Sequence, residues 1–416
     1  MVSRCPKLIA AWPCEELVVK SVLLSVCCIL TANFAFGDWR QFRGNDVNGV
    51  GEKQEAPKSL SEIAWKSGLP GRGLSGPIVV GDRVVVTSSS GIDQNRLHVQ
   101  CFNAKTGEEE WHRQFWATGR TMCHNKMCVA TPTPASDGKR IFAFYSSNDV
   151  ICLDLAGNLL WYRGLTYDYP NASNSLGMAS SPIVVGDTLV VQVESDAEAF
   201  AVGLNTENGM ERWKIDRPRR ANWTSPVVFQ NGDEQPLALL QSSKGVQAVD
   251  PKTGEVVWNY TDGASTIPSS AVSGGVIYVP SHGITALRPN AESESPEIVW
   301  QAGQLSPGTA SPFVYGGKVY TVNSSGALTC GDVKTGKRLW QLRLAGPFSG
   351  SPVGVGGKIY FFSEKGLGQV VEPGEKKGEI VNKHDFEETF LCTPAVSDGA
   401  IYIRSDRTLY KIASKK

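Results

Sequence analysis

The sequence lacks a net charge, a good supply of histidine and, after its first 37 residues, any long apolar run. Lysine plus arginine and aspartate plus glutamate both number 41, so no overall field attracts nucleic acid or an anionic membrane. Only five histidines are present, and no later segment is apolar for long enough to span a bilayer. We therefore expect local sites, rather than bulk charge, to recognise the partners of this chain.

The N-terminus has the organisation of a secretory signal peptide. Basic residues precede the apolar run SVLLSVCCILTA, which is too short to cross a bilayer, and the small residues Ala35 and Gly37 stand just before Asp38. We expect export to the periplasm or the extracellular space. The expected organisation is a signal peptide at 1–37, an N-terminal extension at 38–61 and a folded domain at 62–416.

One phrase recurs along the chain, in the forms NAKTGEEEW, NTENGMERW, DPKTGEVVW and DVKTGKRLW. A second phrase precedes it in each unit: serine or threonine, proline, an apolar run, a Gly-Asp or Gly-Gly turn and another apolar run, as in SPIVVGDTLVV. Each unit therefore predicts four short antiparallel strands joined by tight turns. The tryptophans at the repeated register are Trp65, Trp111, Trp161, Trp213, Trp258, Trp300 and Trp340.

Eight such units at a spacing of roughly 40 to 50 residues predict an all-β fold, an eight-bladed β-propeller. A β-sandwich has no reason to repeat tryptophan at one register. The last unit ends without a fourth strand, whereas a spare strand, EIAWKSG, precedes the first unit. We expect this N-terminal strand to pair with TLYKIA and close the ring, which removes exposed sheet edges. Asn382 stands where the seventh unit should have tryptophan.

The DxKTGxxxW phrase and its spacing resemble the repeat of the pyrroloquinoline quinone (PQQ) propellers. That family includes quinoprotein dehydrogenases and non-catalytic relatives such as the lipoprotein subunit of the bacterial outer-membrane β-barrel assembly machine. DWRQFRG, just after the predicted signal peptide, resembles the start of secreted bacterial PQQ-like propellers. Catalytic members pair adjacent cysteines against the quinone, bind calcium through Glu, Asn and Asp, and use an Asp base. Here the adjacent cysteines, Cys27 and Cys28, lie in the predicted signal peptide.

Three cysteines occupy one position of the repeat. Cys101, Cys152 and Cys330 each stand two residues before the Asn or Asp that ends the third strand of a unit. Gly203 and Ala248 occupy the same position in other units, so this position requires a small residue. Because cysteine behaves as a small apolar residue when it is buried, we expect these three to be structural.

The stretch TMCHNKMC contains two further cysteines, Cys123 and Cys128, in the connection between the first two units. A haem attachment motif would need a third cysteine at Arg120. A zinc site would need a second pair of ligands, but the other histidines are scattered over different units, so we expect no metal. A disulfide that cross-links the loop and a pair of free thiols both remain open.

Long irregular connections over the first four units are where binding residues are expected, since long loops on a rigid scaffold commonly carry function. The stretch RPRRANW combines arginines with a tryptophan, which suits the binding of an anion against an aromatic face. Alternatively, these side chains only support neighbouring loops. The candidate site residues are Arg120, His124, Tyr169, Asn174, Arg219, Arg220, Asn222 and Trp223.

Three functions follow from these patterns. The favoured hypothesis is a non-catalytic, monomeric, exported propeller that binds an envelope protein or a surface polymer, with no catalytic residues and no cofactor. The second is a quinoprotein-type oxidoreductase that uses PQQ with calcium. The third is a carbohydrate-binding propeller that uses tyrosine and tryptophan of the rim.

Overall fold

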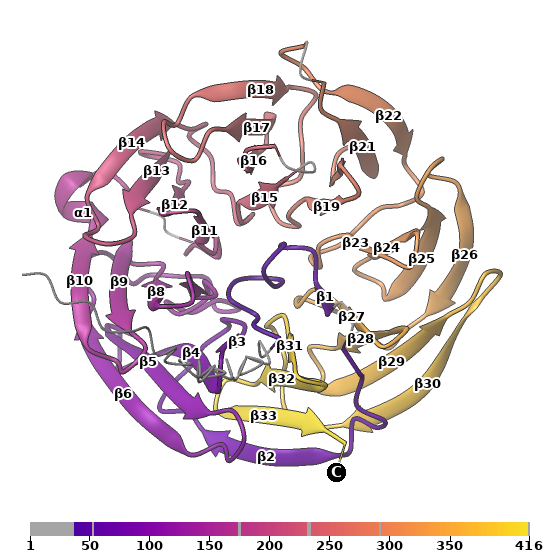
Figure 1. Cartoon of the computed structure of the whole chain (residues 1–416), viewed down its shortest axis with the longest axis horizontal. Helices are drawn as coiled ribbons and strands as arrows, with labels where there is room; N and C mark the ends of the chain where they lie inside the picture. Colours follow the sequence, from indigo (N-terminus) through magenta and orange to yellow (C-terminus); the bar gives the residue numbers. More distant parts are fainter. Residues whose placement is uncertain (1–36, 52–53, 174–175, 231–233, 291–292, 415–416) are drawn as a thin grey trace, which may run out of the picture. The chain divides into compact units, whose positions relative to one another are not determined.

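Eight four-stranded antiparallel sheets surround one axis in the computed structural model, which describes residues 37–51, 54–173, 176–230, 234–290 and 293–414 (Figure 1). The eight-bladed propeller predicted from the repeat is confirmed. The predicted signal peptide lies outside the described residues, apart from Gly37. Across the described ranges, no helix has the length and apolarity that a membrane crossing requires.

The first four blades follow one another along the chain, each running from its innermost to its outermost strand. A single four-residue helix within the described ranges, α1 (Leu165–Asp168), follows the second blade. The strands of these blades are β3 (Ile78–Val80), β4 (Arg83–Ser90), β5 (Arg96–Asn103) and β6 (Glu109–Trp116); β7 (Ala135–Ser136), β8 (Arg140–Phe144), β9 (Asp149–Asp154) and β10 (Leu159–Gly164); β11 (Ile183–Val185), β12 (Thr188–Val193), β13 (Phe200–Asn205) and β14 (Glu211–Asp216); and β15 (Val227–Phe229), β16 (Leu237–Ser242), β17 (Gly245–Val249) and β18 (Val256–Tyr260).

The other four blades repeat this order, and the seventh has an extra inner strand, β1 (Val50–Gly51), parallel to its first strand. Their strands are β19 (Ala271–Ser273), β20 (Val276–Val279), β21 (Ile284–Arg288) and β22 (Glu297–Ala302); β23 (Phe313–Tyr315), β24 (Lys318–Val322), β25 (Ala327–Asp332) and β26 (Arg338–Arg343); β27 (Val353–Val355), β28 (Lys358–Phe362), β29 (Leu367–Pro373) and β30 (Gly378–Asp385); and β31 (Ala395–Ser397), β32 (Ala400–Arg404), β33 (Thr408–Ala413) and β2 (Ile63–Gly68).

The N-terminal strand β2 completes the eighth blade, as the sequence predicts. It pairs antiparallel with β33, with Ile63 opposite Ile412 and Gly68 opposite Thr408. The N-terminal and C-terminal strands therefore lie side by side at the outer edge of one sheet, where they close the ring (Figure 1).

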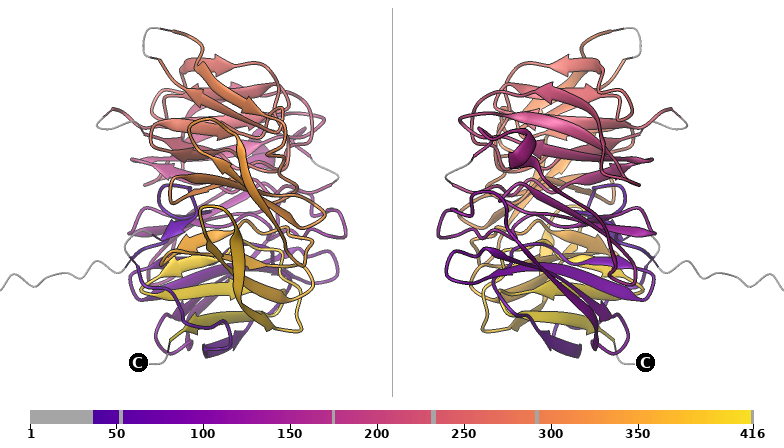
Figure 2. Two further views of the ribbon diagram at one scale, coloured as in Figure 1. Left: turned by 90° about the vertical axis from the view of Figure 1, so that its right-hand side faces the viewer. Right: turned by 90° about the vertical axis from the view of Figure 1, so that its left-hand side faces the viewer.

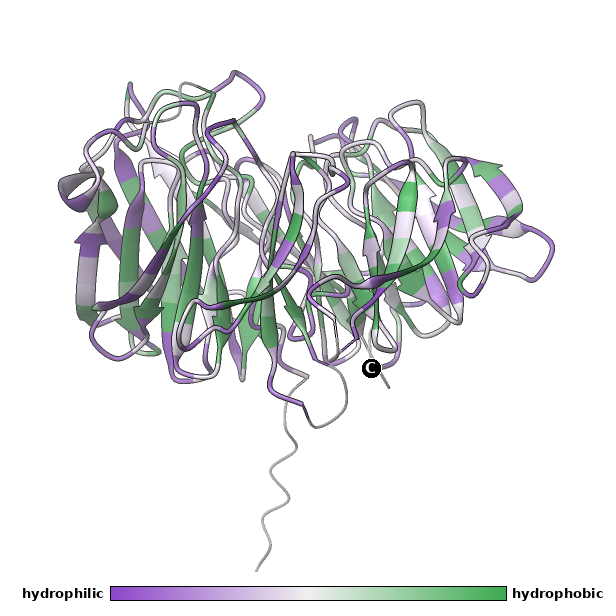
Figure 3. Ribbon diagram, turned by 90° about the horizontal axis from the view of Figure 1, so that it is seen from above, coloured by the Kyte–Doolittle hydropathy of each residue, from purple (hydrophilic) through white to green (hydrophobic). Residues whose placement is uncertain are grey.

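The repeated tryptophan of the fourth strand pairs with the position of the third strand that the repeat keeps small. Cys101 lies opposite Trp111, and Cys330 lies opposite Trp340. All three repeat cysteines are fully buried, and burial raises the pKa of the Cys330 thiol to about 11. These observations support the expected structural role. Hydrophobic residues are frequent in the strands (Figure 3), and the apolar core clusters combine buried residues from neighbouring blades.

Residues 37–51 lie at the centre of the ring, surrounded by the inner strands (Figure 1). Trp39 forms an antiparallel bridge with Val79 of β3, and the Gln41 side chain accepts a hydrogen bond from the backbone N–H of Val184 at 3.0 Å. The buried guanidinium of Arg43 donates to the backbone oxygens of Ser270 and Pro312, at 2.9 and 2.7 Å. The N-terminal extension thus contacts several blades from the inside, which sequence patterns did not reveal.

Candidate functional site

The strands of each blade run between the two ends of the ring (Figure 2). Because the four strands are antiparallel, the interblade connections lie at one end and the tight turns of the repeat lie at the other. At the interblade end, a cavity of about 400 Å³ lies on the axis. We call this cavity the axial funnel. Every blade contributes to its wall, because each innermost strand starts there.

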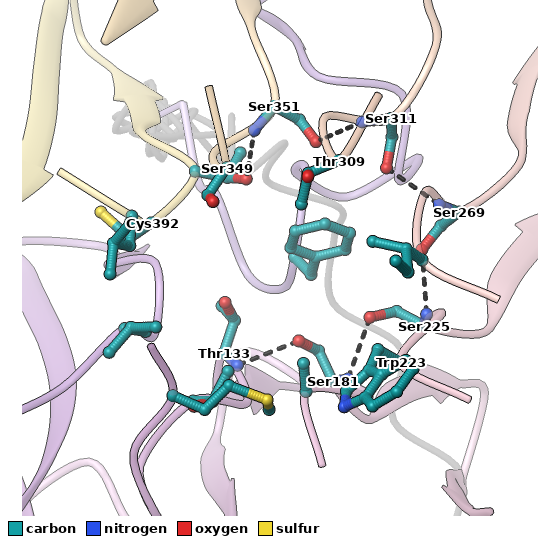
Figure 4. Close-up of a pocket in the computed structure, with 18 of the residues that line it drawn as sticks. Thr133, Ser181, Trp223, Ser225, Ser269, Thr309, Ser311, Ser349, Ser351 and Cys392 are labelled. Atoms are coloured by element: carbon teal, nitrogen blue, oxygen red, sulfur yellow. Dashed lines mark hydrogen bonds between the residues drawn. The ribbon is translucent and has the colours of Figure 1, made fainter. Parts of the chain in front are cut away.

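Seven hydroxyl side chains form the inner level of the axial funnel, and we call them the hydroxyl ring. In six of the seven members the backbone N–H donates to the hydroxyl of the next blade's member, at 2.9 to 3.1 Å, as the dashed lines in Figure 4 show. Gly76 occupies the eighth position and donates to Thr133 at 2.9 Å. The members are Thr133, Ser181, Ser225, Ser269, Ser311, Ser351 and Thr393.

Gly76 interrupts the hydroxyl ring for a steric reason. A Cβ atom at this position would lie 2.6 Å from the backbone oxygen of Thr393, closer than side chains normally approach. The junction between the eighth and first blades is therefore too tight for a serine, and the ring of hydroxyls is open at this single place.

An outer level lies two residues before each ring position, and we call it the outer tier. Alternate residues of an extended chain point the same way, so both levels face the axial funnel. Four outer-tier residues are large and apolar, and Trp223 is among those labelled in Figure 4. The outer tier consists of Leu74, Thr131, Ala179, Trp223, Ile267, Thr309, Ser349 and Leu391.

The mouth and the floor of the axial funnel come from outside the repeat. His124, Lys126 and Met127, from the connection after the first blade, line the mouth. Lys126 Nζ lies 2.7 Å from Glu364 Oε1 of the seventh blade, so this ion pair links the connection after the first blade to the seventh blade. Phe42 of the N-terminal extension also lines the cavity.

The structure brings two of the predicted site residues, His124 and Trp223, to the axial funnel. The indole N–H of Trp223 donates to the backbone oxygen of Gly177 at 3.0 Å, which fixes the ring at the wall. Arg219 and Arg220 are exposed and do not line this cavity. Of these predicted residues, His124 and Trp223 therefore line the funnel, and Arg219 and Arg220 lie on the outer surface. Asn222 is buried.

Asn222 belongs to a buried polar cluster with Glu194 and Arg217. The amide of Asn222 donates to Glu194 Oε2 at 2.6 Å, and Arg217 Nε lies 2.7 Å from Glu194 Oε1, with both charged side chains almost fully buried. Burial raises the pKa of Glu194, although Arg217 and Asn222 oppose this. The arginine of RPRRANW that binds a carboxylate is therefore Arg217, and that carboxylate belongs to the chain itself.

The remaining predicted rim residues lie elsewhere. Tyr169 packs on Phe200, with ring centroids 4.4 Å apart, and its hydroxyl donates to Glu211 at 2.5 Å. Arg120 is exposed, with Nη2 3.3 Å from the sulfur of Met122. Asn174 lies outside the described residues.

Cys123 and Cys128 are free thiols in this structure, which matches the second of the two alternatives that the sequence left open. Cys123 packs against Gly177 and its sulfur accepts from Gln94 Nε2 at 3.8 Å. Cys128 is buried in the core between the first two blades, 3.7 Å from the Thr131 hydroxyl. The two thiols have different neighbours because the loop packs into the core at Cys128.

Sequence analysis missed the hydroxyl ring, although its signal was present. Serine or threonine before proline opens six of the eight units and precedes the innermost strand of each of them. Equivalent positions of a propeller converge on its axis, so a polar residue repeated at the start of the innermost strand predicts a ring of polar groups.

The repeat and the closed eight-bladed ring are those of a PQQ-type propeller. The chain belongs to the family whose model is described as outer membrane protein assembly factor BamB, which matches residues 58–214, 173–337, 283–375 and 326–416.

Two curated relatives are polyvinylalcohol dehydrogenases. The protein from Pseudomonas sp. is 27% identical over 240 residues, which cover 47% of this chain and 35% of that protein. The protein from Sphingopyxis sp. (strain 113P3) is 25% identical over 253 residues, covering 49% of this chain and 36% of that protein. The matched segment thus spans only about a third of the length of these relatives.

Solved structures share the fold at low identity. BamB from Moraxella catarrhalis has a TM-score of 0.60 at 17% identity, covering 84% of this chain and 96% of that chain. Quinohemoprotein alcohol dehydrogenase from Comamonas testosteroni has a TM-score of 0.69 at 12% identity, covering 91% and 81%. Both non-catalytic and catalytic propellers are therefore similar in architecture.

The residues of the axial funnel do not fit PQQ bound with calcium. Calcium takes six to eight oxygen ligands, several of them carboxylates. Among the described residues that line this cavity, none is an aspartate or a glutamate. Glu364, which accepts from the Ser349 hydroxyl at 2.7 Å, is already paired with Lys126. The lining contains one cysteine, Cys392, with Leu391 and Thr393 beside it in place of a second cysteine.

Proposed function

We propose that this chain is a non-catalytic binding module of the cell envelope that holds a segment of a partner protein in its axial funnel. The observation that carries this proposal is the composition of the wall. Apolar side chains of the outer tier lie above the polar hydroxyl ring. Pockets of this volume with both apolar and polar walls are typical ligand sites. The family description, an assembly factor, agrees with a role in binding proteins.

The form of the axial funnel supports binding rather than passage. Phe42 lines the cavity, and the adjacent Arg43 is hydrogen-bonded to two blades, so the N-terminal extension occupies the axis below it. An exposed apolar residue at the mouth, Ile267, is 45% accessible. When a partner covers an exposed apolar side chain at the edge of a concave site, burial of that surface contributes to the free energy of binding.

The experiment is affinity capture from the envelope fraction of the producing cell, with the protein after removal of its predicted signal peptide. Ile267→Ala should lower capture of a specific partner by about tenfold, the effect of losing an apolar contact worth about 1 to 2 kcal/mol. The matched control is Ile92→Ala, because Ile92 is fully exposed and does not line the funnel. Equal capture by both variants would remove the axial funnel as the binding site.

A quinoprotein-type oxidoreductase is the second candidate, favoured by the similarity to polyvinylalcohol dehydrogenases. The test is titration with PQQ and calcium, followed by absorbance and by dye reduction with primary and secondary alcohols. We expect no stoichiometric uptake, because the lining supplies no set of carboxylates for the metal. Uptake together with turnover would establish the second candidate in place of the first.

A further inference from the structure

The hydroxyl ring presents hydrogen-bond donors to the axial funnel. Each ring oxygen accepts a backbone N–H from the neighbouring blade, and a hydroxyl that accepts in this way still has one proton to donate. Within the described part of the chain, no acceptor receives these protons. The seven side chains are only 3 to 6% exposed, and all of them line the cavity.

Such an arrangement favours a ligand group that only accepts hydrogen bonds. Seven hydroxyls line one cavity, each with a proton to donate. Each buried donor that finds no partner costs roughly 1 to 3 kcal/mol. A neutral group with its own donors, such as an amide NH₂, satisfies fewer of them. A carboxylate offers two oxygens with about four acceptor sites and no donor, which matches a ring of hydroxyls.

A buried positive charge also lies near the axial funnel. Lys126 at the mouth is paired with Glu364, and among the described residues that line the cavity no side chain is acidic. Arg43 donates to Ser270 and Pro312, the residues directly after two ring members. Its Nε is buried without a partner, and no carboxylate of the described chain forms an ion pair with it. A fixed positive charge therefore lies beside the hydroxyl ring.

The outer tier adds an apolar requirement just above the ring. Leu74, Trp223, Ile267 and Leu391 surround the space between the ring and the mouth. A ligand that satisfies both levels has a carboxylate at its end and an apolar group immediately before it. The C-terminus of a polypeptide with an apolar last residue has this order of groups, and protein sites for terminal carboxylates are a known mode of recognition.

We propose that the axial funnel binds the C-terminus of a partner polypeptide, with the terminal carboxylate inside the hydroxyl ring and the last apolar side chain against the outer tier. This inference rests on the proposed function, since it names the part of the partner that enters the funnel. It requires the free carboxylate, whereas the proposed function alone requires only an apolar segment.

The test is calorimetric titration of the protein with four N-acetylated hexapeptides that end in leucine, isoleucine, valine or phenylalanine, each as the free acid and as the C-terminal amide. We expect at least one free acid to bind about tenfold or more tightly than its amide, the effect of hydrogen bonds to a charged group. Octanoate provides the same carboxylate from a lipid source. Inorganic phosphate tests for a simple anion site.

Ring variants separate the carboxylate from the apolar contact. Ser269→Ala should reduce the preference for acid over amide, and Ser269→Thr, which keeps a hydroxyl, should restore it. Ile267→Ala should weaken the acid and the amide equally. A melting curve for each variant identifies loss of folding, because Ser269 also accepts the N–H of Ser225.

Three outcomes would overturn the inference. Equal affinity for acid and amide, or no binding of any peptide at millimolar concentration, would exclude the terminal carboxylate. Octanoate or phosphate binding as tightly as the best peptide would assign the ring to a lipid or an inorganic anion. In each case, loss of envelope capture in Ile267→Ala would leave the proposed function standing, so the two failures are distinguishable.

Discussion

The indole N–H of Trp65 donates a hydrogen bond to the backbone oxygen of Ala104 at 3.2 Å, and its ring covers Gly107 in the same turn. Trp65 belongs to the eighth blade and Ala104 to the first, so this contact joins the two ends of the ring. The same relationship recurs between neighbouring blades, for example from Trp111 to Leu155 at 3.0 Å. The repeated phrase therefore encodes a contact between blades.

Deletion of residues 38–68 should open the ring, because it removes β2 and the N-terminal extension together. We expect aggregation and a lower melting temperature, since an exposed sheet edge is a site of association. Light scattering and a thermal melt measure both effects. A deletion variant as soluble and as stable as the parent would contradict the closure.

Trp65→Ala tests the same contact without deletion. We expect a loss of about 3 to 5 kcal/mol in the free energy of unfolding, as for large aromatics removed from cores. The measurement is denaturant unfolding. Trp116→Ala is the control, because Trp116 is 59% exposed and its truncation should cost under about 0.5 kcal/mol.

Gly107→Ala should destabilise the protein through two effects. The backbone has φ of +76°, which strains any residue with a Cβ atom, and that atom would lie 2.6 Å from the Trp65 ring. Gly317→Ala is the matched control, since its φ of +71° is similar and the position has open space. The difference in melting temperature isolates the clash with tryptophan. Equal losses would show that the indole does not pack tightly on this turn.

Arg217→Leu should cost about 3 to 5 kcal/mol, the effect of leaving the buried carboxylate of Glu194 without its cation. Arg219→Leu, two residues away and exposed, should change stability by under about 0.5 kcal/mol. Denaturant unfolding of both variants gives the comparison. Similar values for the two arginines would mean that the buried ion pair contributes no more than a surface charge.

Protonation of His98 should weaken the fold at low pH. Burial, then His112 and Arg96, lower the pKa of His98 to about 4, and its Nδ1 lies 2.9 Å from His112 Nε2. Its unfolded pKa is about 6.5, so the unfolded chain binds more protons between these values. Stability should therefore fall as pH drops from about 6.5 to 4. Melting curves across this range test it, with His98→Gln expected to show a shallower decline.

In the N-terminal extension and at the rim, sequence patterns did not predict which side chains are buried or what they contact. Arg217, Arg219 and Arg220 lie within four residues, yet the first is buried and the other two are exposed. Nothing in the stretch RPRRANW distinguishes them, because Glu194, the partner of Arg217, follows an earlier strand of the third blade, 23 residues before it. Likewise, nothing in residues 37–51 indicates that Arg43 reaches the strands of two blades.

By itself, the sequence determined the number of blades, their four strands and the closing role of β2. Each of these features depends on local periodicity and on a phrase repeated at a fixed register. Tertiary structure alone decided which residues face the axis, since Thr133 and Thr393, far apart in the sequence, come to lie on either side of Gly76 only when the ring closes. It also gave Cys123 and Cys128 different neighbours, because Cys128 packs into the core between the first two blades.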